Sequence, residues 1–340
     1  MKNRTYRMVW SQYKLVLSII SVSTLAGVLL WALYSSDPNI IPSSDSIPKL
    51  NLEKYDQLYQ MALLGNPAAL SSALKLSQEE SPSLRERAAN LLGHYEDPEA
   101  LKALKELIRD KNELVRVQTI HALARGMGPH HKQILIDRIH DNQLSDLEKS
   151  HLYSSLFNLT RQSKEDHELK LLSLDHLIYL ILNSEDPKAQ QISSGSLSQI
   201  HYDEPKVTDL FKNQIESQTN PIIQSHMIKY LASIQEPWFK TIAPSLYENN
   251  QLDRLTHQSL IEVLHLVCPP RRPEYIRRYL NSTDLALVSA MLAQVHFHNN
   301  QDTRKALSYF LANAPSDLKN LTKRRLKELG ESRRPDRCAQ

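Results

Sequence analysis

Residues 81–126 contain apolar positions that recur with helical spacing, and the pattern repeats within the segment. Positions 84, 88, 91, 92 and 95 are apolar and share one face of a helix, which predicts a first helix. Asp97-Pro98 opens a second helix, because an acidic cap accepts hydrogen bonds from free N–H groups and proline tolerates the first turn. The first pattern recurs about 31 residues later, where Leu84, Arg85, Ala88, Leu91 and Leu92 are replaced by Val115, Arg116, Thr119, Ala122 and Leu123. Such a helix pair cannot bury its own apolar face and needs a neighbouring pair.

The same repeat spacing of apolar positions continues along the rest of the chain. It places first helices near residues 52, 84, 115, 148, 189, 223, 255, 287 and 318, and partner helices from near 67, 98, 130, 166, 205, 237, 272 and 302. The fit is poorer at 148 and 255, where Glu148 and Glu262 fall on the apolar stripe. Residues 160–187 contain LKLLSLDHLIYLILN, which is apolar nearly all round, so this segment is either deeply buried or contacts a partner.

Within residues 81–126, three features resemble HEAT repeats of the short, bilin-lyase-like type. They are Asp97-Pro98-Glu99-Ala100, the run from there to Asp110, and Leu114-Val115-Arg116 followed by Ala122-Leu123. Tetratricopeptide repeats have a similar period, but their W…LG…Y…A…F order is missing here. We therefore expect an all-α fold, a HEAT-like α-solenoid of about eight helix pairs over residues 51–330, preceded by one transmembrane helix.

The amino terminus predicts a membrane anchor. Residues 1–14 are basic and contain no acid, and residues 15–34 are an uncharged run of about 20 residues, long enough for a bilayer core of roughly 30 Å. Aromatic residues at both ends would lie at the membrane interfaces: Trp10, Tyr13, Trp31 and Tyr34. A cleaved signal peptide is the alternative, although its apolar core is usually shorter, about 7–15 residues.

These segments suggest an order along the chain. Residues 1–14 form a cytoplasmic basic segment and 15–34 a transmembrane signal anchor, because positive charge stays inside. Residues 35–50 are a Pro/Ser linker, and 331–340 a flexible basic tail. The body would then lie on the periplasmic, or more generally exocytoplasmic, side of the inner membrane.

Composition argues against most kinds of chemistry. Only 7 glycines occur, and they cannot form a Gly-rich phosphate loop. The net charge of +3 is too small to indicate a nucleic-acid binder. The 14 histidines include no metal-binding motif, and no nucleophile–base pair is visible. We expect no enzyme activity, cofactor or metal. Cys268 and Cys338 could form a disulfide outside the cytoplasm, but the sequence cannot establish that pairing.

The remaining candidates for function are basic residues on the predicted partner helices. The resemblance implies that these helices line a concave surface, where an anionic partner could bind: Lys102, Lys105, Arg109, Arg271, Arg272, Arg277 and Arg278. Ordinary solvated helix faces are the alternative, since acids are interleaved. We predict a scaffold or accessory subunit that binds other envelope proteins, with no nucleic acid and no small-molecule substrate. The alternatives are a HEAT-like lyase-type enzyme or chromophore-binding protein that uses the concave face, and a nucleic-acid binder.

Overall fold

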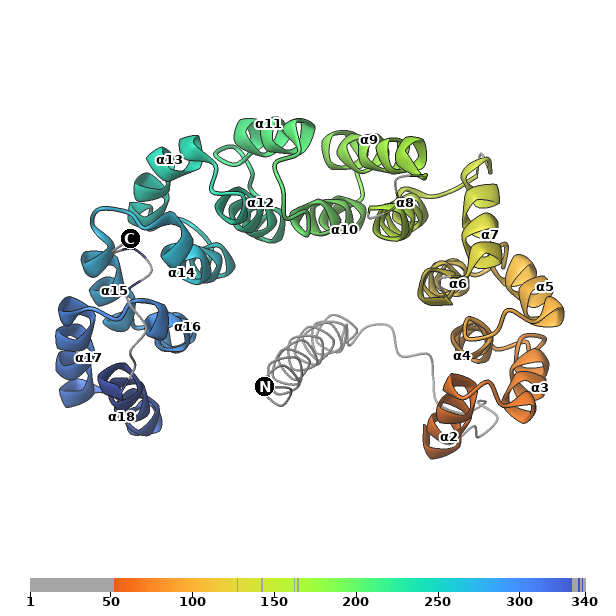
Figure 1. Ribbon diagram of the computed structural model, residues 1–340, viewed down its shortest axis with the longest axis horizontal. Helices are drawn as coiled ribbons and strands as arrows, with labels where there is room; N and C mark the ends of the chain where they lie inside the picture. The colour runs from red at the N-terminus through yellow and green to blue at the C-terminus, as the bar shows by residue number, and fades with distance from the viewer. Residues whose placement is uncertain are drawn as a thin grey trace, which may run out of the picture. The chain divides into compact units, whose positions relative to one another are not determined.

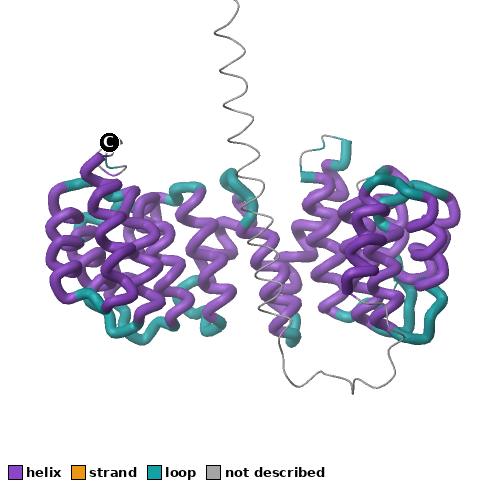
Figure 2. The backbone as a smooth tube through the Cα atoms, turned by 90° about the horizontal axis from the view of Figure 1, so that it is seen from below, coloured by secondary structure: helices purple, strands orange, loops and turns teal. Residues whose placement is uncertain are grey.

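The computed structural model describes residues 52–126, 128–141, 143–161, 163, 165–331, 336 and 338. Over these residues it contains 17 α-helices and one short 3-10 helix, and no strand (Figure 2). Contacts divide the chain into Met1–Tyr55 and Asp56–Gln340, and nearly all described residues belong to the second unit. No helix among the described residues is long and apolar enough to cross a membrane. The predicted anchor, residues 15–34, lies outside them.

The helices alternate between first and partner helices, as the sequence predicts. The first helices are α2 (Leu52–Leu63), α4 (Pro82–Leu92), α6 (Glu113–Gly126), α8 (Asp146–Thr160), α10 (Pro187–Ser198), α12 (Pro221–Ser233), α14 (Arg254–Val267) and α16 (Leu285–Gln294). The partner helices are α3 (Pro67–Leu76), α5 (Pro98–Leu107), α7 (Pro129–Ile139), α9 (His167–Asn183), α11 (Pro205–Gln214), α13 (Pro237–Glu248), α15 (Arg272–Leu280) and α17 (Gln301–Asn313). The 3-10 helix η1 (Val295–Phe297) follows α16, and α18 (Ser316–Glu331) ends the array.

Many of these helices begin at a polar cap followed by proline. The Asp97 side chain accepts a hydrogen bond from the backbone N–H of Glu99 at 2.8 Å, and Glu236 caps α13 in the same way. Ser81 and Glu204 stand at cap positions without a side-chain cap bond. Proline alone therefore sets the start of α4 and α11, because its fixed φ suits the first turn.

The first and partner helices form two layers within residues 56–340. Neighbouring first helices pack directly on one another from α4 to α16, whereas neighbouring partner helices from α3 to α15 touch much less (Figure 1). A Cβ atom on Gly93 would lie 2.7 Å from the carbonyl oxygen of Ala122, which shows how closely α4 and α6 approach. The first helices therefore form the inner layer. The expectation that partner helices line the concave surface was wrong, because α5 and α15 lie in the outer layer.

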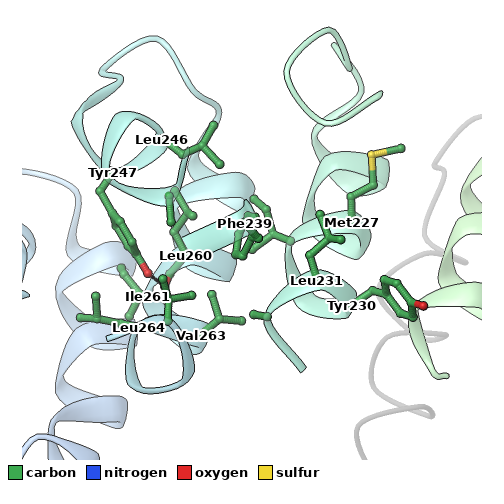
Figure 3. Packing of buried hydrophobic residues seen from close by; sticks show 14 of the residues in the cluster. Met227, Tyr230, Leu231, Phe239, Leu246, Tyr247, Leu260, Ile261, Val263 and Leu264 are labelled. Carbon is green, nitrogen blue, oxygen red and sulfur yellow. Dashed lines mark hydrogen bonds between the residues drawn. The ribbon is translucent and has the colours of Figure 1, made fainter. Parts of the chain in front are cut away.

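The buried side chains follow the predicted stripe. Positions 84, 88, 91, 92 and 95 are all buried. Glu148 is fully buried on α8, so it lies among the buried stripe residues, as the repeat spacing placed it. Glu262 is exposed and pairs with Lys229 at 2.9 Å. The core continues through α12, α13 and α14, where Leu231 and Phe239 pack in the same cluster as the residues of α14 (Figure 3).

Candidate functional site

Two arginines at the same position of consecutive repeats join each repeat to the next. Arg85 donates to the backbone carbonyls of Glu79 and Glu80 at 2.8 and 2.6 Å, and to the carboxylate of Asp110 at 2.6 and 2.9 Å. Arg116 likewise donates to two carbonyls of the loop before α6, and to both oxygens of Glu148 at 2.8 Å. Bidentate pairs of this kind fix orientation as well as adding energy.

The carboxylates of these pairs stay ionised despite burial. Burial alone would raise the pKa of Glu148, but hydrogen bonds and charge from Arg116, with a further bond from Arg138, hold that pKa below its usual value. The pKa of Asp110 is lowered in the same way, because Arg85 and the backbone N–H of Asn112 outweigh the effect of burial. These arginines and carboxylates thus stabilise the contacts between stacked repeats, and their charges pair with one another.

Polar side chains also connect neighbouring helices of the inner layer. The His121 Nε2 and His151 Nδ1 atoms lie 2.8 Å apart across α6 and α8, and the Ser194 hydroxyl lies 2.9 Å from His226 Nδ1 across α10 and α12. Burial lowers the pKa of His121 to about 4, of His151 to about 3 and of His226 to about 4. All three are therefore neutral at physiological pH, and they link helices without adding charge to this layer.

The contact between Ser194 and His226 does not make a nucleophile. Ser194 is fully buried, and its hydroxyl also donates to the carbonyl of Gln191 at 3.0 Å. A catalytic serine needs an accessible oxygen and a base that is itself oriented by a third group. The charged residue that acts on His226 is Lys229, and because it is a cation it lowers the pKa of His226 instead of making it a stronger base.

A groove of about 640 Å³ lies where the loops after α5 and α7 meet. It is lined by the charged residues Arg109, Asp110, Lys111, Arg116, Arg138 and Asp141, together with His140. Arg116 and Arg138 are already paired with Glu148, and Arg138 also with Asp141. Arg109 is half exposed and lies 3.4 Å from Asp141. Of the basic residues that line the groove, Arg109 and Lys111 are thus the exposed ones.

The seven basic residues predicted to bind a partner do not form one patch. Lys102 and Lys105 are exposed on α5, near Arg109 in the loop after it. The other four residues lie on α15 or, in the case of Arg271, directly before it, five pairs further along the array. Most of the arginines at α15 already have partners within the chain. Arg271 pairs with Glu248 and Glu274, and Arg278 donates to the carbonyl of Tyr247 and to Asn250.

Arg272 on α15 anchors the end of the chain. It donates two hydrogen bonds, of 2.8 and 2.7 Å, to the buried carboxylate of Asp336, and Cys338 is disulfide-bonded to Cys268 at the end of α14. The expected flexible tail over 331–340 therefore does not describe Asp336 and Cys338. Arg277 instead lines a second groove, of about 360 Å³, between α15 and α17.

A possible metal cluster lies beside this tail. Potential ligand atoms of His298, Asp336 and Cys338 lie within 4.8 Å of one another. The sulfur of Cys338 is in the disulfide, and both oxygens of Asp336 already accept hydrogen bonds from Arg272, Asn300 and the Cys338 backbone. The available donors are too few for a zinc site, so the cluster fastens the tail. The four residues predicted at the membrane interface, Trp10, Tyr13, Trp31 and Tyr34, lie outside the described residues.

Sequence reasoning missed the histidine contacts of the inner layer. His121 and His151 are separated by 30 residues, and Ser194 and His226 by 32. Both separations equal about one repeat. A search for polar residues one period apart would have found these pairs.

Comparison with known proteins gives the repeat type. Residues 67–154 match the model of HEAT repeats, which confirms the resemblance seen in the sequence. No curated protein matches the chain. A chain in a homology model of the full-length AP-3 complex, in an intermediate open conformation, is similar in fold: 12% identity, TM-score 0.58, covering 82% of this chain and 53% of that one. This chain thus spans about half of that AP-3 chain.

Two other structures are weaker matches. Human deoxyhypusine hydroxylase in complex with glycerol has 14% identity and a TM-score of 0.31, and the alignment covers 73% of this chain and 91% of the hydroxylase chain. A computationally designed self-assembling cyclic homooligomer has 14% identity and a TM-score of 0.14, covering 82% and 93%. Neither similarity is close enough to carry an argument. The repeat match over residues 67–154 and the similarity in fold to the AP-3 chain indicate a HEAT-type solenoid, an architecture typical of protein–protein interaction scaffolds.

Proposed function

We propose that this protein is a single-pass inner-membrane protein whose helical array lies on the periplasmic, or more generally exocytoplasmic, side and binds other envelope proteins as a scaffold or accessory subunit. The array of stacked helix pairs carries this proposal, because a solenoid presents extended surfaces to long or multiple partners. A lyase-type enzyme would need polar groups converging in a pocket of the inner layer. The charged groove lies instead at the loops, and most of its charges pair with one another.

The disulfide supports the location. Disulfides persist in oxidising compartments and are rare in the cytoplasm. The bond between Cys268 and Cys338 therefore favours a body outside the cytoplasm. The basic residues 1–14 followed by the uncharged run 15–34 favour the same orientation independently.

The partner surface we propose is the exposed side of α5. Lys102 and Lys105 are exposed on α5, and Arg109 and Lys111 are exposed in the loop that follows it and line the groove. These four cations outnumber the exposed acids of α5, Glu99 and Glu106, and Arg109 stays half exposed although it lies 3.4 Å from Asp141. The surface therefore suits an acidic segment of a partner. The arginines of α15 fit this role less well, because Arg271, Arg272 and Arg278 already have partners within the chain.

Reporter fusions at the carboxyl terminus test the location. Alkaline phosphatase, which folds only in an oxidising compartment, should be active, and a fluorescent protein that requires the cytoplasm should be dark. The opposite result would place the array in the cytoplasm and overturn the proposed location.

A pull-down from detergent-solubilised membranes tests the surface. The full chain should capture one or more envelope proteins, and the triple variant Lys102→Glu, Lys105→Glu, Arg109→Glu should lose at least one of them. The matched control carries the same charge change on α18, at the exposed residues Lys319, Lys323 and Lys327. If the α5 variant retains every partner that the control retains, the proposed surface is wrong.

A further inference from the structure

A fully buried histidine lies beside the disulfide near the end of the array. His298 directly follows η1, and neither of its ring nitrogens has a hydrogen-bond partner among the described residues. A buried imidazole with both nitrogens unpaired costs free energy and calls for an explanation. Burial and the charge of Arg272 lower the pKa of His298 to about 3. The ring is therefore neutral, and one nitrogen carries a lone pair that a metal ion can take.

The donor closest in kind to this imidazole is sulfur. One ring nitrogen of His298 lies within 4.8 Å of the Cys338 sulfur, which is bonded to the sulfur of Cys268. Both cysteines are half-buried. Thiolate sulfur and imidazole nitrogen are the donors that zinc prefers. While the two sulfurs are bonded to each other they cannot act as thiolates, so the disulfide form has too few donors for a metal.

The neighbouring carboxylate holds Cys338 in place. The two oxygens of Asp336 accept two hydrogen bonds from Arg272, one from the side-chain amide of Asn300 and one from the backbone N–H of Cys338. A carboxylate has about four lone-pair positions, so these four bonds fill it and it is not needed as a ligand. None of them involves the disulfide. They therefore keep Cys338 beside His298 after the bond between the sulfurs is broken.

We propose that the reduced chain binds one zinc ion through Cys268, Cys338 and His298, with a water molecule in the fourth position. A dithiol reductant supplies two electrons and two protons, becomes a disulfide itself and leaves two thiols on the protein. Zinc displaces both thiol protons to solvent, so that two thiolates and a neutral imidazole surround the ion. The reverse exchange with a disulfide oxidant restores the bond between the cysteines and releases the ion.

The change from disulfide to metal site needs only a small movement. Zinc–sulfur bonds are about 2.3 Å long, so two thiolates on a tetrahedral ion lie roughly 3.8 Å apart. The Cα atoms of Cys268 and Cys338 are 5.4 Å apart, and rotation about the Cα–Cβ bonds brings the sulfurs to this separation with the backbone in place. The charges also match. Two thiolates balance a divalent cation, and Arg272 is already paired with Asp336 at 2.7 Å.

Metal titration of the purified full-length chain in detergent tests the site. The chain is reduced with a dithiol, separated from it without oxygen, and titrated with Co²⁺, whose absorption reports thiolate ligands and tetrahedral coordination. The reduced chain should bind one equivalent of Co²⁺ with thiolate-to-cobalt charge-transfer absorption, and Zn²⁺ should displace it. The oxidised chain should bind neither ion in this way. A reduced chain that binds no Co²⁺, or binds it without the charge-transfer absorption, overturns the proposal.

Substitutions assign the ligands. In the reduced state, Cys338→Ser and His298→Gln should each weaken Zn²⁺ binding by about 100-fold, because even residues that only orient a metal ligand contribute about 10- to 100-fold. The matched control is His296→Gln, which should bind Zn²⁺ like the wild type. The ring of His296 lies two residues away, and its Nδ1 atom donates to the carbonyl of Ala293 at 2.9 Å.

The remaining outcomes are also decisive. Unchanged Zn²⁺ affinity in Cys338→Ser or in His298→Gln overturns the proposal, as does a loss confined to His296→Gln. Circular dichroism shows whether the histidine variants are folded. If His298→Gln is not, Cys338→Ser decides, since the reduced wild type also lacks the disulfide and Cys338 lies beyond the last helix. The titration uses the purified chain, so its result is independent of the reporter fusions that test the proposed location.

Discussion

The first repeats, α4 to α8, and the middle repeats, α10 to α14, join neighbouring units through the same position but with different chemistry. In the first repeats that position holds Arg85 and Arg116, whose guanidinium groups bind the carbonyls of the preceding loop. In the middle repeats it holds glutamine. Gln190 donates to the carbonyl of Ser184 at 2.8 Å, and Gln224 donates to that of Ile215 at 3.0 Å.

The contact toward the next repeat changes in the same way. The arginines donate to carboxylates, whereas the amide oxygen of Gln224 accepts a hydrogen bond from the Thr256 hydroxyl at 3.0 Å. Thr256 occupies the equivalent position on α14. A neutral amide thus keeps both the contact to the preceding loop and the contact to the following repeat, and the ion pair disappears.

This difference shows which part of the repeat the fold requires. The stack needs a long donor that reaches the preceding loop, and it accepts either a guanidinium or an amide in that role. The match to HEAT repeats covers residues 67–154, the part of the chain that contains the arginine–carboxylate pairs. The middle repeats keep the geometry with other residues, so their repeat pattern is harder to recognise in sequence. The predictions below test whether the two kinds of joint differ in strength.

The largest effect should come from breaking the apolar packing on which both regions depend. Leu92 is fully buried between stacked helices. Leu92→Asp should destabilise the first repeats by about 5 kcal/mol or more, because it removes a buried leucine and buries an unpaired carboxylate. Urea denaturation followed by circular dichroism measures this. Leu114→Asp, on an exposed leucine of α6, is the control and should have little effect. If Leu92→Asp unfolds like the wild type, the assignment of this core is wrong.

The charged joint should be the next most sensitive. Glu148→Gln removes the buried carboxylate that Arg116 and Arg138 share and leaves Arg138 with Asp141 alone, which should cost about 3 kcal/mol. The matched control is Glu262→Gln, which breaks an exposed pair with Lys229 and should cost less than about 1 kcal/mol. Equal losses in the two variants, measured by urea denaturation, would show that the buried network does not hold the first repeats together.

Acid should weaken both regions through the neutral histidines. Burial lowers the pKa of His226 to about 4 from its ordinary 6.5, so the unfolded chain binds this proton more readily than the folded chain. The stabilisation is complete above pH 6.5 and is lost as the pH falls toward 4. At pH 5 the wild type should have lost about 2 kcal/mol more than His226→Asn, relative to pH 7.

The first repeats offer the parallel test. Burial lowers the pKa of His121 to about 4 as well, so His121→Asn should reduce the acid sensitivity in the same direction. Urea denaturation at pH 7 and pH 5 measures both variants. If neither variant differs from the wild type in its response to pH, the histidines are already protonated or exposed in the folded chain.

The helix pairs themselves could be predicted from the sequence because their signals are local. The spacing of apolar residues and the acid–proline starts placed α5, α11 and α13 at their observed first residues, 98, 205 and 237. The disulfide, in contrast, joins residues 70 apart in sequence, and no local pattern reports that Cys338 returns to Cys268. The same holds for the pairing of Arg272 with Asp336.

The layer of each helix could not be predicted either. Both helices of a pair carry an apolar face, so the pattern does not say which one lies inside the bend. That choice follows from close packing, such as the approach of Gly93 to Ala122, which depends on the backbones of two repeats. Glu148 shows the same limit. From the local pattern a carboxylate on the apolar stripe is a poor fit, because the arginines that pair with it lie on other helices, α6 and α7.

The neutral joint of the middle repeats should show the smallest effect. Gln224→Met keeps the length of the side chain but removes its hydrogen bonds, and leaves the carbonyl of Ile215 and the hydroxyl of Thr256 without this partner. The expected cost is about 1–2 kcal/mol, because both groups are neutral. Gln251→Met, at an exposed position in the loop before α14, is the matched control and should change nothing. A loss as large as that of Glu148→Gln would mean that the amide joint carries as much of the stack as the ion pair does, so the charge of the first repeats would not account for their strength.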